Sequence, residues 1–309
     1  MRSVRALTAV AIGASLSLLA ACGSSSNPTV SGNSAAPTGK AASDTIVVGS
    51  ANFQENVVLA DIYADALKAK GVKVSTKLNI GSRETYIPAL KDGSIDLIPE
   101  YSGVLLQYFD KTATAVSSDD VYSALQKAVP SPLTVLNQSQ AEDKDAMVVT
   151  KATSEKYNLH SIADLAAVGS KLTLGAPPEF ATRTDGVPGL EKLYNIKFKT
   201  FRKLDAGGPL TENALKNGQI SVGDIFTTDP LIAKNGWVVL DDPKNLYTAQ
   251  NVVPLINSSK ASDNVKQILD AVSAKLTTDD LVQLNEKVQL NKQDPDKVAQ
   301  AWLSSAGLS

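Results

Sequence analysis

The chain carries ALKDGSI at residues 89–95 and, much later, ALKNGQI at residues 214–220. In both copies the pattern predicts a helix that ends at its glycine and leads into a strand. An aromatic residue follows each copy at the same distance, Tyr101 in the first and Phe226 in the second. The repetition predicts two related α/β units in one chain, although a helix ending of this kind is also common enough to recur by chance.

Strands and helices alternate on the N-terminal side of the first copy. A β-branched run at residues 46–48 predicts a buried strand, and Asn52 is the expected N-cap of the helix after it. A strand at 72–78, a helix at 84–91 and a strand at 95–98 are expected next. This order predicts parallel sheets covered by helices on both faces. Ligands of such sheets bind beyond the carboxyl ends of the strands, so Tyr101 and Phe226 are expected to face one another across a cleft.

Composition excludes several classes of function. The 309 residues are 43% hydrophobic and 20% charged, enough for two domains that each bury a core. The net charge of -2 leaves no basic surface for nucleic acid. One cysteine excludes an internal disulfide, and one cysteine with one histidine is too few ligands for Cys-based or His-rich metal sites. We therefore expect a protein that is not an enzyme and uses no metal or cofactor, with a carboxylate-dependent hydrolase as a minor alternative.

The N-terminal residues predict export and a lipid anchor. Residues 1–21 combine Arg2 and Arg5 with an apolar run, which is typical of a signal peptide. The run is shorter than the roughly 20 residues that span a bilayer. The sequence LAAC at residues 19–22 resembles a bacterial lipobox, which implies cleavage before Cys22 and a diacylglycerol on its thiol. The alternative is an ordinary secretory signal followed by an incidental cysteine.

Residues 22–44 are expected to be a flexible tether between the lipidated cysteine and the folded part. They are mostly Ser, Gly, Ala, Pro and Thr, so they cannot bury enough apolar surface to offset the entropy of ordering. The sequence thus predicts an extracytoplasmic, monomeric protein that meets the membrane only through its lipid.

Blocks in both halves resemble one protein family. Residues 95–103 read IDLIPEYSG, residues 179–190 read EFATRTDGVPGL, and shorter blocks are NF at 52–53, NIGS at 79–82 and FTTD at 226–229. From about Ile46 to Leu303 the chain resembles the glycine betaine, choline and carnitine receptors of ABC importers, of the ProX/OpuC type.

The resemblance implies a type II periplasmic-binding fold of class α/β, with two lobes joined by two crossover segments. Lobe I would comprise residues 45–142 and 249–309, and lobe II residues 146–247. The lobes would close around a small solute in the cleft between them, and the closed receptor would deliver it to an ABC permease subunit.

In that family four tyrosines surround a quaternary ammonium and an arginine holds the carboxylate. Tyr101 matches the first cage tyrosine and Arg183 matches the arginine. Phe226 stands at the third cage position and keeps the ring without the hydroxyl. Asp145 stands at the second position and Gln250 at the fourth, so about half of the cage is aromatic.

Other departures from the family pattern concern smaller contacts. Tyr247 lies three residues from Gln250, and the sequence leaves open which of them lines the pocket. Val104 replaces a hydroxyl residue, and Ala51 replaces a lysine of some members. Asn52, near the start of the first helix, is a further candidate that could present its side chain or backbone N–H groups to an anionic group.

The depleted cage leaves the ligand open. Betaine-like osmoprotectants are the default expectation, because rings and an arginine coincide with the family pattern. A pocket that has diverged toward a larger polar or aromatic ligand, bound through Asp145 and Gln250, is the alternative. A purely structural lipoprotein is the third option.

Overall fold

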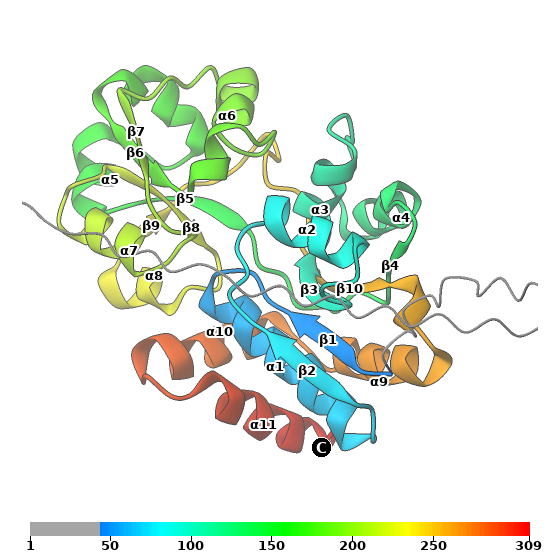
Figure 1. Cartoon of the computed structure of the whole chain (residues 1–309). Helices are drawn as coiled ribbons and strands as arrows, with labels where there is room; N and C mark the ends of the chain where they lie inside the picture. The colour runs from blue at the N-terminus through cyan, green and yellow to red at the C-terminus, as the bar shows by residue number, and fades with distance from the viewer. Residues whose placement is uncertain (1–43) are drawn as a thin grey trace, which may run out of the picture. The chain divides into compact units, whose positions relative to one another are not determined.

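The structure is a computed structural model and describes residues 44–309. The predicted signal peptide, the lipidation site Cys22 and nearly all of the predicted tether lie outside the described residues. Within residues 44–309 the strands form two five-stranded sheets, and we call the parts built on them lobe I and lobe II (Figure 1). Across this part of the chain, no helix combines the length and the apolar character that crossing a membrane requires.

Lobe I is built on a sheet with strand order β2-β1-β3-β10-β4. Its strands are β1 (Ile46–Gly49), β2 (Val74–Lys77), β3 (Leu97–Tyr101), β4 (Leu133–Val135) and β10 (Val252–Asn257). Its helices are α1 (Gln54–Ala69), α2 (Arg83–Lys91), α3 (Ser102–Phe109), α4 (Ser118–Ala128), α9 (Asp263–Ser273), α10 (Thr278–Asn285) and α11 (Pro295–Ala306). A short 3-10 helix, Ser258–Lys260, precedes α9, and a π-helical turn, Glu286–Leu290, follows α10.

Lobe II is built on a sheet with strand order β7-β6-β8-β5-β9. Its strands are β5 (Asp145–Val149), β6 (Thr173–Ala176), β7 (Thr200–Lys203), β8 (Val222–Phe226) and β9 (Val238–Val239). Its α-helices are α5 (Lys151–Tyr157), α6 (Val187–Tyr194), α7 (Pro209–Lys216) and α8 (Pro230–Asn235), and its 3-10 helices are Ile162–Ala167, Gly169–Lys171 and Pro178–Ala181.

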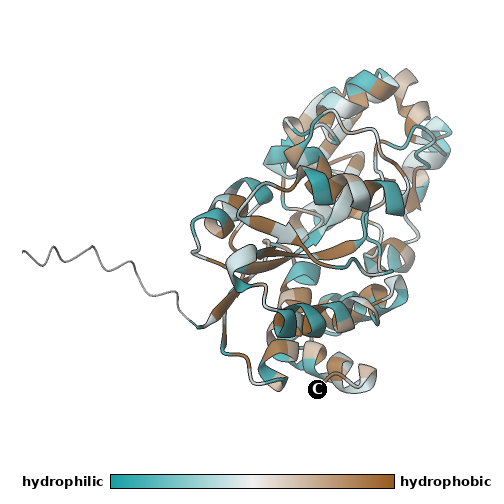
Figure 2. Cartoon of the chain, turned by 90° about the vertical axis from the view of Figure 1, so that its right-hand side faces the viewer, coloured by the Kyte–Doolittle hydropathy of each residue, from teal (hydrophilic) through white to brown (hydrophobic). Residues whose placement is uncertain are grey.

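Helices cover both faces of the lobe I sheet. Leu97 of β3 packs into a core with α1, α9 and α11, whereas Ile98, its neighbour, packs into a second core with α2, α3 and α4. This alternation is the expected consequence of the two-residue period of a strand. The interior strands are predominantly apolar and the surrounding helices carry the hydrophilic surface (Figure 2). The predicted fold class, two α/β lobes, is confirmed.

Both sheets are mixed, so the expectation of parallel sheets is correct for the pairs β1–β2, β1–β3, β6–β7 and β6–β8 and wrong for the others. β10 runs antiparallel to β3 and β4, and β5 runs antiparallel to β8 and β9. The reason is the path of the chain, which passes from β4 to β5 and back from β9 to β10. The two connecting segments lie side by side, since the N–H of Asp143 donates to the carbonyl of Gln250 at 3.2 Å.

The two copies of the repeated sequence have matching structures. Gly93 follows α2 with φ 77° and Gly218 follows α7 with φ 67°, a left-handed conformation that favours glycine. Each helix leads into the middle strand of its own sheet, β3 or β8. Tyr101 is the last residue of β3 and Phe226 is the last residue of β8. The repeat therefore places one ring at the carboxyl end of each middle strand.

Two local expectations need correction. Helix α1 begins at Gln54 with Phe53 as its N-cap, so Asn52 lies one residue too early to cap it. Asn56, in the first turn of the helix, instead holds the preceding segment in place, since its Oδ1 accepts a hydrogen bond from the N–H of Ala51 at 2.7 Å. The strand expected at 95–98 is β3, Leu97–Tyr101. It extends to Tyr101 because β10, distant in sequence, pairs with it over that length.

Candidate functional site

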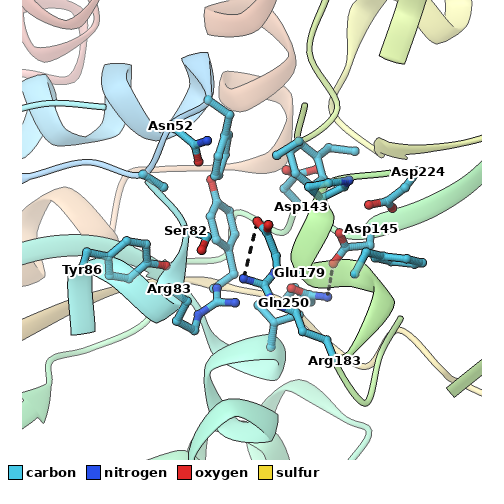
Figure 3. Close-up of a pocket in the computed structure, with 18 residues that line it drawn as sticks. Asn52, Ser82, Arg83, Tyr86, Asp143, Asp145, Glu179, Arg183, Asp224 and Gln250 are labelled. Atoms are coloured by element: carbon cyan, nitrogen blue, oxygen red, sulfur yellow. Dashed lines mark hydrogen bonds and ion pairs between the residues drawn. The ribbon is translucent and has the colours of Figure 1, made fainter. Parts of the chain in front are cut away.

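A cavity between the lobes is lined by residues from both of them and from the connecting segments (Figure 3). It holds about 620 Å³ of space between its walls, including the part open to solvent. The lining residues are Ala51, Asn52, Phe53, Ser82, Arg83, Tyr86, Tyr101, Val104, Asp143, Asp145, Pro177, Glu179, Phe180, Arg183, Ala206, Asp224, Phe226 and Gln250.

The structure brings all of the predicted ligand contacts to this one cavity. Its lining includes the six candidates from the sequence, Tyr101, Arg183, Phe226, Asp145, Gln250 and Asn52. Gln250 rather than Tyr247 lies in the wall, because Tyr247 is buried in the core of lobe II. Val104 and Ala51, the two smaller departures from the family pattern, also line it. Their roles toward a ligand stay predictions.

Three aromatic rings meet in the wall across the two lobes. The ring centroid of Phe53 lies 6.0 Å from that of Tyr101 and 5.0 Å from that of Phe226. Phe53 joins the two rings that the sequence predicted, because the chain turns from β1 into α1 at this residue. Its only signal in the sequence is its place in the Asn-Phe block of the family pattern.

The hydroxyl of Tyr101 is already used inside the protein. It donates to Oε1 of Glu55 at 2.7 Å, and burial raises the pKa of Tyr101 well above its usual range. Oε2 of the same glutamate accepts from the Thr228 hydroxyl and from the Asn285 amide, each at 2.6 Å. The neutral tyrosine therefore offers its ring to the cavity, and Glu55 ties that tyrosine to lobe II through Thr228.

An acidic wall faces the cavity from the lobe II side. Asp143, Asp145 and Asp224 are grouped there, with Arg83 and Tyr86 on the opposite side (Figure 3). Burial raises the pKa of Asp145 to about 6. Burial also raises the pKa values of Asp143 and Asp224 well above their usual range, and the charge of Asp145 adds to the shift at Asp224.

Burial of these carboxyls thus disfavours several negative charges at once in the cavity wall. Asp224 is 1% exposed, and among the described residues its Oδ1 has no hydrogen-bond partner. The amide of Gln250 donates to Asp145 Oδ2 at 3.5 Å, a long hydrogen bond. A cation bound here would relieve the mutual repulsion of the aspartates.

The two arginines of the cavity are both held by glutamates. Arg83 donates from Nε and Nη2 to the two carboxylate oxygens of Glu100, each at 2.7 Å, in a buried pair that Tyr86 also joins. Arg183 donates from Nε and Nη2 to the two carboxylate oxygens of Glu84, at 3.0 and 2.9 Å. Glu84 belongs to α2 in lobe I, so this second pair joins the lobes.

Two glycines of the family blocks allow close approach of the backbone. We call the block at residues 179–190, which carries Arg183, the arginine loop; a side chain at its Gly186 would place its Cβ 1.9 Å from the carbonyl oxygen of Phe180. A side chain at Gly103 would place its Cβ 2.5 Å from the carbonyl oxygen of Ala249, in the second connecting segment. Only glycine fits at these two positions, which bring Arg183 and Gln250 to the cavity.

Several residues of the site carried no usable signal in the sequence. The sequence does not show that Glu84 pairs with Arg183 or that Arg83 pairs with Glu100, because only the folded chain brings these residues together. Asp224 is an ordinary strand residue in the sequence, and only the pairing of β5 with β8 brings it near Asp145. Asp143 lies two residues before Asp145, the residue at the second cage position of the family pattern.

Comparisons with known proteins agree with this architecture. The glycine-betaine-binding protein of Pseudomonas aeruginosa is 27% identical over 281 residues, which cover 86% of this chain and 89% of the relative. The ergothioneine transport permease/ergothioneine binding protein EgtU of Helicobacter pylori is 25% identical over 268 residues, 85% of this chain and 48% of that longer protein.

A crystal structure of a glycine betaine/carnitine/choline ABC transporter has the same fold, with a TM-score of 0.66 and 22% identity, and the match covers 85% of this chain and 99% of that one. Residues 44–305 match the family described as the substrate binding domain of the ABC-type glycine betaine transport system. The rings, the arginine loop and the two-lobed fold thus have a common explanation. The chain belongs to the family of substrate-binding domains of ABC-type glycine betaine transport systems.

Proposed function

We propose that this protein is the extracytoplasmic receptor of an ABC importer and that it captures a small methylated-ammonium solute between its lobes. One observation carries the proposal: rings from both lobes and a group of aspartates line the same cavity. The solute would belong to the glycine betaine, choline and carnitine class.

The chemistry of the wall suits such a cation. A methylated ammonium group has no N–H to donate, so the electron-rich faces of aromatic rings attract it, by about 2 kcal/mol or more when desolvated. Phe53, Tyr101 and Phe226 supply three faces. Asp145 and Gln250 stand where the family has two further rings, and the carboxylate supplies countercharge in place of a ring.

Capture would proceed by closure of the lobes. A solute that touches both lobes binds the closed form more tightly and shifts the population toward it. The connecting segments near residues 143–145 and 247–249 are the proposed hinges. We place the lobe boundaries at 45–142 with 249–309 and at 146–247, as the sequence predicts.

The receptor would stay near the membrane through Cys22, whose thiol is the proposed lipidation site. In this proposal it acts as a monomer, releases its solute to a permease subunit and performs no chemical reaction on it. The family to which the chain belongs supports the transport role. The lipobox-like sequence at residues 19–22 supports the anchor.

A larger polar or aromatic ligand is the second candidate. The presence of Asp145 and Gln250 at two cage positions favours it, because both can exchange hydrogen bonds with a ligand. The resemblance to a receptor that is named for ergothioneine supports the same possibility.

A ligand panel tests the proposal directly. Isothermal titration calorimetry on the purified folded protein would compare glycine betaine, choline, carnitine and ergothioneine, with thermal unfolding as a second readout. We expect at least one saturable ligand that raises the melting temperature. Absence of binding to the whole panel would overturn the proposed ligand class, and turnover of a ligand, followed by NMR, would favour an enzyme.

A further inference from the structure

The ion pair between Arg183 and Glu84 is the starting point, because it occupies the arginine that the family pattern assigns to a ligand carboxylate. Both carboxylate oxygens of Glu84 accept from the guanidinium, at 3.0 and 2.9 Å. This parallel two-bond arrangement is the one in which an arginine would hold a carboxylate of a ligand. Glu84, which lies outside the lining of this cavity, thus uses the N–H groups with which Arg183 would hold that carboxylate.

The position of Glu84 is itself supported. The hydroxyl of Ser82, a lining residue of the cavity, donates to Glu84 Oε2 at 2.6 Å. Burial acts to raise the pKa of Glu84, but the hydrogen bonds from Arg183 and Ser82 lower it to about 2. The glutamate therefore stays ionised and paired throughout the physiological pH range. Glu179 adds a second negative group, with its Oε1 3.9 Å from Arg183 Nη2.

Arg83, the other arginine of the cavity, is not free to replace it. Its Nε and Nη2 are both bonded to Glu100, which is fully buried. Breaking a buried pair of this kind is strongly unfavourable, because the remaining charge is left without compensation. A ligand carboxylate would thus find each guanidinium already engaged by an internal carboxylate.

The acidic groups of the cavity are in the opposite situation. Among residues 44–309, no lysine or arginine lies within ion-pair distance of Asp143, Asp145 or Asp224. The lining has two arginines against four acidic residues, Asp143, Asp145, Glu179 and Asp224. The lining therefore holds more acidic than basic groups, and both basic groups are already paired, so an added carboxylate would find no free cation beside the aspartates.

We propose that Glu84 determines specificity by occupying Arg183, so that the cavity favours cations without a carboxylate, such as choline, over zwitterions such as glycine betaine. This inference rests on the proposed function, since it concerns the ligand of the same cavity. A zwitterion must either displace Glu84 from Arg183 or leave its own carboxylate beside the aspartates. A cation with a hydroxyl group meets neither cost and can donate that hydroxyl to an aspartate.

The test is calorimetry with choline and with glycine betaine on the wild-type protein and on Glu84→Gln. We expect the wild type to bind choline more tightly. Glutamine keeps the shape but gives up the charge, so Arg183 becomes available and the betaine-to-choline affinity ratio should rise by roughly tenfold or more, the effect of one charge-assisted hydrogen bond. Glu191→Gln is the matched control: it removes the same charge from an exposed pair with Lys197, and the ratio should stay as in the wild type.

The outcomes separate the inference from the proposed function. If both ligands bind and the ratio is the same in Glu84→Gln as in the wild type, the role of Glu84 is refuted while the receptor function stands. If neither ligand binds either protein, the inference fails, and titration with carnitine and ergothioneine decides whether the proposed ligand class fails with it. Should Glu84→Gln not fold, as judged by circular dichroism, the wild type decides, because tighter binding of glycine betaine than of choline would contradict the inference.

Discussion

Removal of the Thr228 hydroxyl tests whether Glu55 couples the aromatic wall to closure of the lobes. Thr228 lies in lobe II, directly after β8, and its hydroxyl donates to Glu55 of α1 in lobe I at 2.6 Å. The same glutamate holds the Tyr101 hydroxyl at 2.7 Å. Thr228→Val keeps the volume of the side chain and removes this contact together with the hydroxyl that accepts from the Asn285 amide at 3.0 Å, while the backbone N–H of residue 228 can still donate to Asp143.

The expected magnitude follows from the charge of the acceptor. A hydrogen bond to a charged group contributes about 1.5–3 kcal/mol, and its loss corresponds to roughly a 10- to 150-fold change in an equilibrium constant. The contact joins the lobes, so its loss should lower the ratio of closed to open receptor by that factor. When binding requires the closed form, the apparent Kd weakens in proportion.

Calorimetry with the tightest ligand of the panel measures this Kd, and small-angle X-ray scattering measures the closed fraction. We expect weaker binding by tenfold or more and a larger radius of gyration in the presence of a fixed ligand concentration. Thr182→Val is the control, since that hydroxyl donates only to the nearby carbonyl of Glu179 in its own lobe. A Kd of Thr228→Val within twofold of the wild type, in a folded protein, would refute the coupling through Glu55.

Phe53→Leu keeps an apolar side chain but removes a ring face, so calorimetry should show that binding of a methylated-ammonium ligand is weaker by about 1–2 kcal/mol. The control is Phe109→Leu, which changes the ring pair with Tyr108 outside the cavity lining and should leave the affinity unchanged. Burial raises the pKa of Asp145 to about 6, and this carboxyl must be ionised to hold a cation, so affinity should fall by roughly tenfold per pH unit below pH 6, and Asp145→Asn should flatten that profile. Burial favours the protonated carboxyl of Asp145 in the folded state, so its contribution to the free energy of unfolding should rise as the pH falls from about 6 toward 4. A fall in the free energy of unfolding over this range, seen in the wild type and absent from Asp145→Asn, would contradict the raised pKa. Arg83→Met should lower the free energy of unfolding by about 3–5 kcal/mol in urea titrations, because it leaves the charge of Glu100 buried without its partner, and an unchanged midpoint would show that the pair is not needed.

The alternation of short apolar strands with helices, and the repeated helix ending at residues 89–95 and 214–220, were sufficient to predict two α/β lobes. The same repeat located Tyr101 and Phe226, because the distance from a helix end to the end of the next strand is a local property. The arginine loop could be recognised from its family block, whose glycine at 186 has no space for a side chain. These features could be predicted because each depends on residues that are close together in the sequence.

The direction of β10, the third ring at Phe53 and the partners of both arginines depended on the tertiary structure. Glu84 and Arg183 are far apart in the chain and meet only because the lobes approach each other. The sequence identifies a carboxylate or a guanidinium but does not show whether it is paired. Pairing depends on the distance between the two groups, which only the folded structure gives. The sequence alone therefore determined which lobes form and which residues end their middle strands, while the fold decided which charges are neutralised inside the protein and which are left for a ligand.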